Sequence, residues 1–112
     1  MDTNLINNLI SELKRGTQVL AVLSQLRKNQ YGYSLLQTLE EKGVSIEAGT
    51  LYPLLRRLES QGLLQSEWDT TESKPRKYYV LSKDGIETYE TLIQEWRKII
   101  LEMDLIIMEE TK

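Results

Sequence analysis

Residues 49–62 read GTLYPLLRRLESQG, and this stretch decides the fold. Its four leucines recur at helical spacing and predict a helix with one buried face. We expect this helix to be opened by Ser45 and closed by Gly62. Pro53 lies inside it and should bend it, because a proline ring presses on the carbonyl four residues back. The residues predicted to face inward are Leu51, Leu54, Leu55 and Leu58.

The flanking sequence predicts a simple order of further elements. Upstream, apolar residues at helical spacing predict three helices, with a turn over residues 29–32. Downstream, two runs of β-type residues enclose a polar stretch and predict a hairpin. Ser82 and Asp84 suit the start of a last helix, through capping and favourable charge. The expected elements are helices over about 3–14, 19–26, 34–42 and 45–62, strands over 64–69 and 76–81, and a helix from 83 to about 110.

Helices followed by a hairpin with a basic tip are typical of a winged helix-turn-helix. In that architecture the helix over 45–62 enters the major groove of DNA, and the hairpin tip touches the flanking backbone. We therefore predict a mainly α (α+β) fold, in which a winged helix-turn-helix carries an added N-terminal helix and a long C-terminal dimerisation helix. The predicted divisions are residues 1–15 for the N-terminal dimerisation helix, 16–82 for the DNA-binding domain and 83–112 for the C-terminal dimerisation helix.

The last helix carries an apolar stripe that predicts a homodimer. Isoleucines recur in it every seven residues, and a second bulky row follows three residues behind, as in a coiled-coil seam. The helix would span about 42 Å, whereas a core of about 70 residues is only about 28 Å across. Its far half should therefore overhang and pack on a second copy. The alternative is a helix that folds back over its own core and leaves a monomer. The predicted interface residues are Leu9, Ile10, Ile86, Tyr89, Ile93, Trp96, Ile100, Met103 and Ile107.

The composition narrows the function. The 112 residues include no His and no Cys, which removes imidazole and thiolate catalysis and ordinary zinc sites, so we expect no enzyme activity, metal or cofactor. No apolar run is long enough to span a membrane, so we expect a cytoplasmic protein without a membrane partner. The net charge of −3 argues against DNA binding. However, residues 14–83 carry 11 basic and 7 acidic side chains, whereas residues 84–112 carry 3 and 8. The centre of the chain is therefore basic.

Several linked motifs closely resemble those of the PadR family of bacterial transcriptional regulators. They lie in the family's order over residues 16–85. The length and pattern also resemble the family's small subgroup, whose single C-terminal helix dimerises with the help of the N-terminal helix. Ser82 departs from the family pattern, in which threonine is commoner, but either residue can cap a helix. The motifs are Tyr31-Gly32-Tyr33, Gly49-Thr50-Leu51-Tyr52-Pro53-Leu54-Leu55-Arg56-Arg57-Leu58-Glu59, Gly62-Leu63-Leu64, Arg76-Lys77-Tyr78-Tyr79-Val80-Leu81-Ser82 and Gly85.

The resemblance implies a dimeric repressor that binds double-stranded DNA at an inverted-repeat operator, near its own gene or a transporter or detoxification gene. It places DNA contacts on the exposed front of the helix over 45–62 and at the start of the preceding helix. The hairpin would supply charge to the DNA backbone, which positions the protein without reading sequence. One of Tyr78 and Tyr79 should face inward, and the strand pattern leaves open which one. The implied DNA contacts are Tyr33, Thr50, Tyr52, Pro53, Arg57, Lys74, Arg76 and Lys77.

Trp96 carries a separate hypothesis. It falls in the seam of the last helix, where two-fold symmetry brings two indoles together and a bulky ring tends to hold the helices apart. A gap between two indoles would accept a planar, hydrophobic, cationic small molecule by stacking. Some small PadR-like regulators are multidrug sensors with an aromatic-lined pore between subunits, so the resemblance suggests an effector site formed by Ile93, Trp96 and Ile100. The simpler interpretation is that Trp96 only packs in the dimer interface.

A protein-protein interaction adaptor is the alternative to a DNA-binding repressor. Winged helices without DNA activity exist, and the net charge is negative. Replacing Arg57 and Lys77 should weaken DNA binding and flatten its salt dependence if the protein is a repressor, and change neither if it is an adaptor. Acid-base catalysis is not expected, because carboxylates such as Glu40 and Glu102 alternate with basic residues and no pattern places a pair across a pocket.

Overall fold

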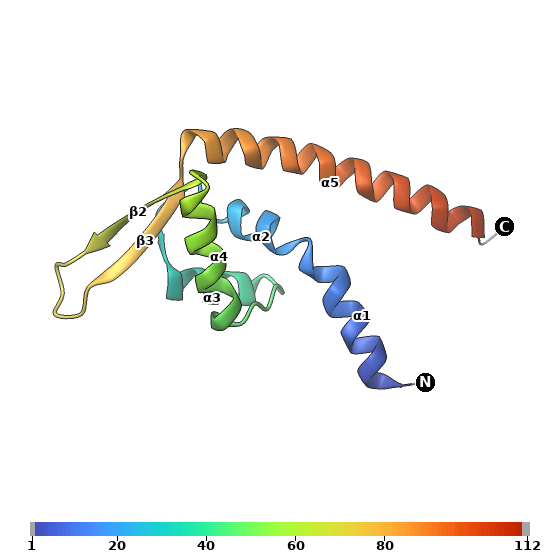
Figure 1. Ribbon diagram of the computed structural model, residues 1–112, viewed down its shortest axis with the longest axis horizontal. Helices are drawn as coiled ribbons and strands as arrows, with labels where there is room; N and C mark the ends of the chain where they lie inside the picture. Colours follow the sequence, from blue (N-terminus) through green and yellow to red (C-terminus); the bar gives the residue numbers. More distant parts are fainter. Residues whose placement is uncertain (1, 111–112) are drawn as a thin grey trace.

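The computed structural model of the protein describes residues 2–110 (Figure 1). Within these residues the chain forms five helices and one three-stranded antiparallel sheet, which confirms the mainly α winged helix-turn-helix fold. The hairpin projects from one side of the helical centre, and the first and last helices extend from the other side. The elements are α1 (Thr3–Arg15), α2 (Gln18–Ser24), β1 (Gln30–Tyr31), α3 (Gly32–Glu41), α4 (Ala48–Ser60), β2 (Leu64–Asp69), β3 (Arg76–Leu81) and α5 (Lys83–Glu110).

The hydrophobic core lies where α2, α3, α4 and the base of the hairpin meet. All four leucines predicted to face inward from α4 are buried, and leucines from α2 and α3 pack against them. Tyr79 is only 4% exposed, so it is the inward-facing tyrosine of the hairpin. Tyr78 is half-buried and its hydroxyl donates to Glu67 at 2.7 Å. The side chains with no exposed surface are Val22, Leu23, Leu26, Leu35, Leu51 and Leu55.

The sheet contains a short strand that the sequence pattern did not predict. Its strand order is β1-β3-β2, and Gln30 in β1 lies opposite Tyr79 in β3. The turn expected over residues 29–32 is therefore wrong, and α3 begins at Gly32 instead of Ser34. The polar residues of this segment resemble a turn locally, but their backbone groups find partners on a strand far along the chain.

The start of α4 also differs from the expectation. The helix begins at Ala48, not at Ser45. Ile46 is buried in the core, and Glu47 is extended at φ −72° and ψ 148°, so the residues before Ala48 cannot continue the helix. The carbonyl of Glu47 accepts the backbone N–H of Thr50 at 2.9 Å, and no side chain caps the helix. From Ala48 the helix continues past Pro53 and ends at Ser60.

The start of α5 agrees with the capping prediction. The backbone N–H of Ser82 donates to the carbonyl of Leu63 at 3.0 Å, and its hydroxyl donates to the carbonyl of Gly62 at 2.6 Å. The same hydroxyl accepts the N–H of Gly85 at 2.9 Å. A Cβ built on Gly85 would lie 2.0 Å from the carbonyl oxygen of Leu63, so this close approach requires glycine.

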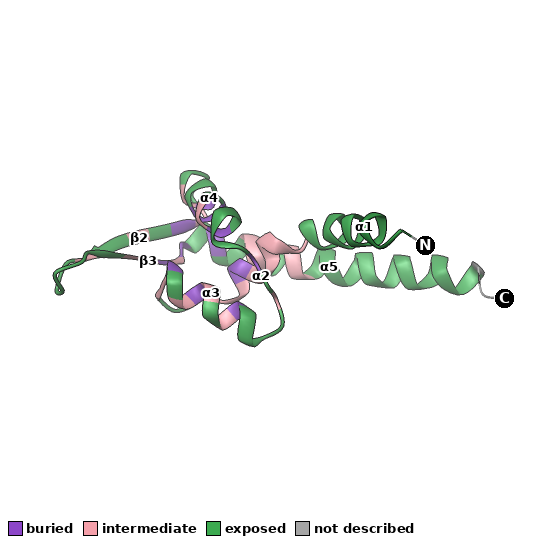
Figure 2. Ribbon diagram, turned by 90° about the horizontal axis from the view of Figure 1, so that it is seen from below, coloured by how far each residue is buried: buried purple, intermediate pink, exposed green. Residues whose placement is uncertain are grey.

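The helices α1 and α5 form two arms that leave the core (Figures 1 and 2). The radius of gyration is 16.8 Å, and the longest extent is 61 Å. A compact chain of this length would have a radius of gyration of about 13 Å. Figure 2 shows both arms exposed beyond their bases, and α1 has no buried residue. The last helix thus overhangs the core instead of folding back over it.

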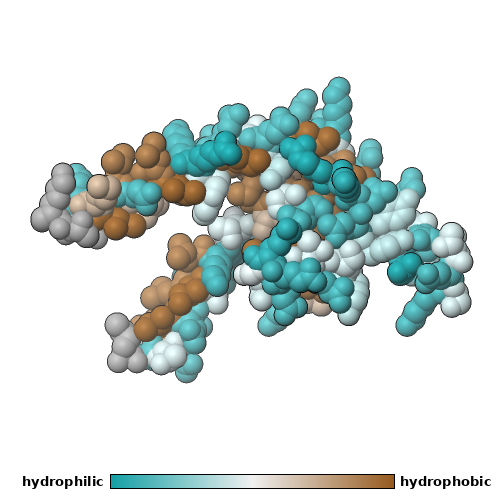
Figure 3. Space-filling model, turned by 180° about the vertical axis from the view of Figure 1, so that it is seen from behind, coloured by the Kyte–Doolittle hydropathy of each residue, from teal (hydrophilic) through white to brown (hydrophobic). Residues whose placement is uncertain are grey.

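Hydrophobic surface gathers along both arms (Figure 3). Of the predicted interface residues, Tyr89 and Ile93 are half-buried, and Tyr89 packs against the core. Apolar surface of this extent is unfavourable in water, so we expect another surface to pack against the arms. That this surface is a second copy of the chain remains a prediction. Among residues 2–110, no helix combines the length and the apolar character needed to cross a membrane. The exposed members of the predicted interface are Leu9, Ile10, Ile86, Trp96, Ile100, Met103 and Ile107.

Candidate nucleic-acid interface

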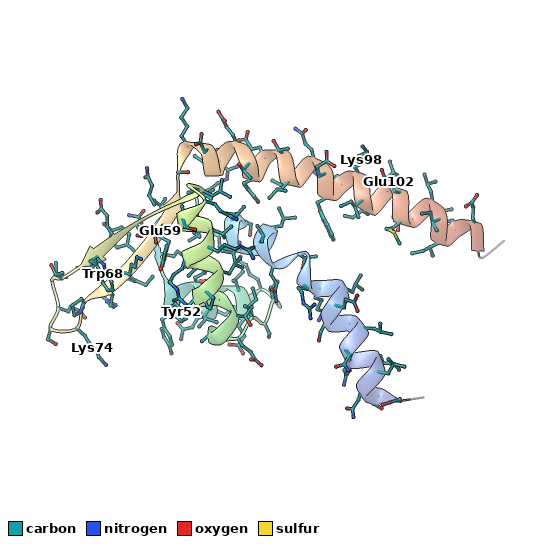
Figure 4. The ribbon with its side chains drawn as sticks, in the orientation of Figure 1. Tyr52, Glu59, Trp68, Lys74, Lys98 and Glu102 are labelled. Atoms are coloured by element: carbon teal, nitrogen blue, oxygen red, sulfur yellow. The ribbon has the colours of Figure 1, made fainter. Side chains whose placement is uncertain are left out.

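One face of α4 is exposed to solvent, opposite its buried leucines. Thr50, Pro53, Arg56 and Arg57 are exposed, and Tyr52 is half-buried at one flank. The helix packs on α3 and contacts β2, so it stands between the other helices and the hairpin (Figure 4). A helix in this position is the recognition helix of a winged helix-turn-helix.

A first groove, the α1–α4 groove, runs between α4 and the junction of α1 with α2. Its volume is about 620 Å³. Three of the predicted DNA contacts, Thr50, Pro53 and Arg57, line it. Arg15 of α1 also lines it, so two guanidinium groups border one flank of the recognition helix.

A second groove, the hairpin groove, lies between α4 and the hairpin and has a volume of about 410 Å³. Figure 4 labels Tyr52 on the α4 side of this space and Trp68 on the hairpin side. Lys74 lies exposed in the hairpin tip and lines neither groove. The structure therefore divides the predicted contacts between the two flanks of α4. The predicted contacts that line the hairpin groove are Tyr33, Tyr52, Arg76 and Lys77.

Tyr52 packs on the start of α3 and also faces the hairpin groove. A Cβ built on Gly32 would lie 2.5 Å from Cε1 of the Tyr52 ring, so the ring rests directly on the glycine. Gly32 is buried, and a side chain at this position would displace the ring. The contact therefore helps to set how α4 sits on α3, and only part of the Tyr52 ring lines the groove.

Lys77 is held by a carboxylate of α4. Its Nζ lies 3.1 Å from Oε1 of Glu59, and the Ser66 hydroxyl donates to the same carboxylate. The hydrogen bond from Ser66 lowers the pKa of Glu59 most, and the hydrogen bond from Lys77 lowers it further. The same bond to Glu59 raises the pKa of Lys77. The ion pair ties β3 to α4 and compensates the charge of Lys77. Its contact with DNA stays a prediction.

Arg76 begins β3 beside the hairpin tip and is held there by an aromatic ring. Its Cζ lies 4.2 Å from the centroid of the Tyr31 ring, within the range of a cation-π contact. One guanidinium nitrogen also lies 3.3 Å from Oε1 of Glu72, on the surface. The Tyr31 hydroxyl donates to Oδ2 of Asp69 at 2.5 Å. These contacts join β1, β2 and β3 and keep Arg76 beside the groove.

The pKa of Asp69 provides a test of this network. Asp69 accepts hydrogen bonds from Tyr31 and from the hydroxyl and N–H of Thr71, and these bonds lower its pKa from 3.8 to about 2. Because the pKa is lower in the folded chain, the bonds stabilise the hairpin fully above about pH 4 and are lost as the pH falls further. A carboxyl-detected NMR titration should place the midpoint of Asp69 at about 2, and Tyr31→Phe should move it back toward 3.8. Ordinary midpoints in both proteins would contradict the network.

Trp96 lines a hollow between α2 and α5 of the same chain, with a volume of about 300 Å³. Ile93 and Ile100, the other residues of the hypothetical effector site, do not line this hollow. Trp96 is 38% exposed, so part of its ring also faces outward. The structure groups Trp96 with the junction of α1 and α2, and the effector site stays a prediction. The hollow is lined by Gly16, Val19, Leu20, Leu92, Glu95, Trp96 and Ile99.

The predicted DNA contacts omit four residues that line the hairpin groove: Tyr31, Arg56, Trp68 and Tyr79. Arg56 was paired with Arg57 by position, and only the orientation of α4 separates them, one toward each flank. Trp68 lies opposite Lys77 in the register of β2 and β3. Cross-strand partners share a face of a sheet, so the hairpin register was the signal that could have found Trp68.

The chain is similar to known transcriptional regulators in both sequence and structure. Residues 19–91 match the family described as the transcriptional regulator PadR-like family. The chain is 38% identical to the transcriptional regulator Rv3488 of Mycobacterium tuberculosis over 75 residues, which cover 66% of this chain and 70% of that protein. It is also similar to a PadR family transcriptional regulator from Eggerthella lenta, with 46% identity, 93% of both chains covered and a TM-score of 0.89. A PadR family transcription regulator from Clostridium difficile shows 32% identity over 82% of this chain and 99% of that chain, with a TM-score of 0.74.

Proposed function

The chain belongs to the PadR-like family of transcriptional regulators, and on this premise we propose that it is a dimeric, cytoplasmic transcriptional repressor that binds double-stranded DNA. Members of the family are transcriptional regulators and not enzymes. The proposed operator is an inverted repeat, because a two-fold dimer presents two equal recognition helices. Residues 16–82 would form the DNA-binding domain, and α1 and α5 would form the dimer contacts.

The observation that carries this proposal is the position of α4 between two basic grooves. Arg15 and Arg57 line one groove, and Arg56 and Arg76 line the other. A recognition helix with cations on both flanks can enter the major groove of DNA while its flanks reach the phosphates on either side. The net charge of −3 does not oppose this arrangement, because acidic residues are concentrated in residues 84–112, and no residue of that segment lines either groove.

The arms support a dimer whose DNA-binding surfaces stay uncovered. They leave the core on the side opposite the hairpin (Figure 1). Two copies joined along α1 and α5 would therefore keep α4 and the hairpin of each copy accessible. The recognition helices of such a dimer must reach successive major grooves, about 34 Å apart.

Replacing Lys74 by alanine tests the DNA-binding proposal. Lys74 is exposed in the hairpin tip, and loss of one phosphate contact should reduce the slope of log K against log salt by about 0.9. Lys98→Ala removes the same charge from α5, away from the hairpin (Figure 4), and should leave affinity and slope unchanged. Gel shifts with duplex DNA of mixed sequence at several salt concentrations measure both. Binding that responds to neither salt nor Lys74 would favour the adaptor.

A finer proposal concerns the effector, a planar hydrophobic cation bound between the subunits near Trp96. The hollow beside Trp96 lies within one chain, and it supports the proposal because its lining combines the Trp96 indole with the side chain of Glu95. A planar cation could stack on the indole while the carboxylate attracts its charge. Val19 lines both this hollow and the α1–α4 groove, so a bound molecule would press on a residue that also faces the recognition helix. Release of DNA would follow from a shift of the recognition helices.

Tryptophan fluorescence tests the effector proposal. A planar cationic dye should quench the emission of the protein in a saturable way, because it stacks on Trp96. Trp96→Phe should abolish the saturable part, whereas Trp68→Phe, which removes the other tryptophan, should keep it. Equal quenching in both variants, or none in the parent protein, would contradict the proposal.

A further inference from the structure

The α1–α4 groove combines positive charge with apolar surface. Nine residues line it, and they include Arg15 and Arg57 but no carboxylate and no aromatic side chain. Its volume of about 620 Å³ lies within the range of small-molecule sites. A groove of this composition suits a small ligand that has an anionic head and an apolar body.

Both arginines of the groove are free to bind an anion. Arg15 lies at the end of α1 and Arg57 on the exposed face of α4, so their guanidinium groups belong to opposite walls. Among residues 2–110, neither guanidinium forms an ion pair or a cation-π contact, whereas Arg76 and Lys77 of the hairpin form both. A guanidinium binds a carboxylate through charge-assisted hydrogen bonds, often two at once. The groove therefore offers uncompensated positive charge on two sides.

The apolar part of the groove is aliphatic. Leu54 is only 8% exposed and belongs to the core, and Val19 is half-buried against the core. Pro53, the neighbour of Leu54, adds apolar surface on the exposed side of α4. Because no aromatic ring lines the groove, it offers no indole for stacking, in contrast to the hollow beside Trp96. Its surface suits methylene groups, which gain free energy when they leave water.

We propose that the α1–α4 groove binds an aliphatic carboxylate of medium chain length. The carboxylate would lie between Arg15 and Arg57, and the hydrocarbon chain would lie along Val19 and Leu54. This ligand differs in charge, shape and site from the planar cation proposed near Trp96. Its binding does not depend on the proposed function.

The bound carboxylate would also keep DNA from the recognition helix. Thr50, Pro53 and Arg57 are predicted DNA contacts, and all three line the same groove. The ligand would occupy Arg57 and fill the space beside the helix, so ligand and DNA would compete. Only this exclusion of DNA rests on the proposed function.

Calorimetric titration of the full-length protein with sodium octanoate tests the site. Octanoate should bind once per chain, and decanoate should bind about tenfold more tightly, because it buries two further CH₂ groups. Octan-1-ol has the same chain without the charge and should bind about tenfold more weakly than octanoate. Arg15→Gln and Arg57→Gln should each weaken octanoate binding about tenfold. Arg56→Gln is the matched control for octanoate, because the same charge is lost from a residue that lines the hairpin groove instead.

Gly49 allows a variant that leaves both arginines in place. It lines the groove, and apart from its chain neighbours and its own helix backbone no atom lies within 4 Å of a Cβ built there. Gly49→Leu should therefore fold and fill part of the groove, and octanoate binding should weaken although the charge is unchanged. Circular dichroism checks that each variant is folded.

The site is wrong if the parent protein does not bind octanoate. It is also wrong if Arg15→Gln and Arg57→Gln bind octanoate as Arg56→Gln does, or if octan-1-ol binds as tightly as octanoate. Either of these results would place the hydrocarbon chain elsewhere, on the apolar surface of the arms.

Fluorescence anisotropy of a labelled duplex of mixed sequence at low salt tests the exclusion of DNA. Octanoate should release the duplex at the concentrations that saturate the calorimetric site, and octan-1-ol at the same concentrations should not. If octanoate binds as predicted and the duplex stays bound, the exclusion is wrong. If octanoate binds as predicted and the parent protein binds no duplex, the proposed function is wrong and the carboxylate site stands.

Discussion

Replacing Gly85 by alanine should lower the free energy of unfolding by about 3 kcal/mol, at the upper end for an overpacked site, and the Tm by roughly 12 °C. The new Cβ would lie 2.0 Å from the carbonyl oxygen of Leu63 and 3.3 Å from Cδ2 of Leu81. The nearest obstacle is backbone, and the same carbonyl accepts the N–H of Ser82 at 3.0 Å. Relief of the clash therefore requires the start of α5 to move away from the core, which breaks the cap. Thermal and urea unfolding followed by circular dichroism measure the loss.

Gly49→Ala is the matched control for this prediction. Gly49 also lies in a helix, but no atom outside its own helix backbone lies within 4 Å of a Cβ built there. The same substitution should therefore stabilise the protein by up to about 1 kcal/mol, since alanine favours a helix over glycine. Equal effects of the two substitutions, or an unchanged Tm for Gly85→Ala, would contradict the close contact of α5 with Leu63.

Replacing Ile100 by glutamate should convert the proposed dimer into a monomer. Ile100 is 40% exposed in the single chain and lies in the apolar stripe of α5. Each copy would lose about 2 kcal/mol of apolar burial and would have to desolvate a carboxylate or protonate it. A total of roughly 6 kcal/mol for two copies corresponds to a dissociation constant about four orders of magnitude higher. Sedimentation velocity should show a monomer at micromolar concentration, and operator-type DNA binding should weaken with it.

Thr91→Glu provides the control for the dimer prediction. Thr91 is exposed on the same helix, and helical geometry places it opposite Ile100, away from the apolar stripe. The Thr91→Glu substitution introduces the same carboxylate outside the apolar stripe, so the dimer should remain intact. A parent protein that sediments as a monomer, or an Ile100→Glu variant that remains a dimer, would show that the arms are covered in another way.

The architecture was predictable because its signals are periodic and local. The leucines of α4 recur at helical spacing and all four are buried, and the heptad of α5 extends along the arm that leaves the core. Ser82 caps α5 as its residue type predicts. Local signals failed where a distant segment decides the conformation. β1 forms because β3 pairs with it, and α4 starts late because Ile46 is drawn into the core.

The candidate site was only partly predictable. Arg57 was chosen from the Arg-Arg pair, but the structure places Arg56 in the hairpin groove and Arg57 in the α1–α4 groove. One residue corresponds to about 100° around a helix, so neighbours face different flanks, and the tertiary contacts of α4 set which flank each one faces. Lys77 was predicted as a phosphate contact from the family resemblance and its place in the basic hairpin, but its partner Glu59 lies on another element.

The sequence by itself determined the order of the helices and the hairpin, the buried faces of the core helices and the exposed apolar stripes of the arms, because these follow from residue spacing and apolar periodicity. Only the tertiary structure decided which cations remain available to an anion, which tyrosine of the hairpin faces the core, and that Trp68 and Tyr33 border one groove. The physical reason is that charge compensation and shared surface depend on distances between segments far apart in the chain, and spacing along the chain carries no information about those distances.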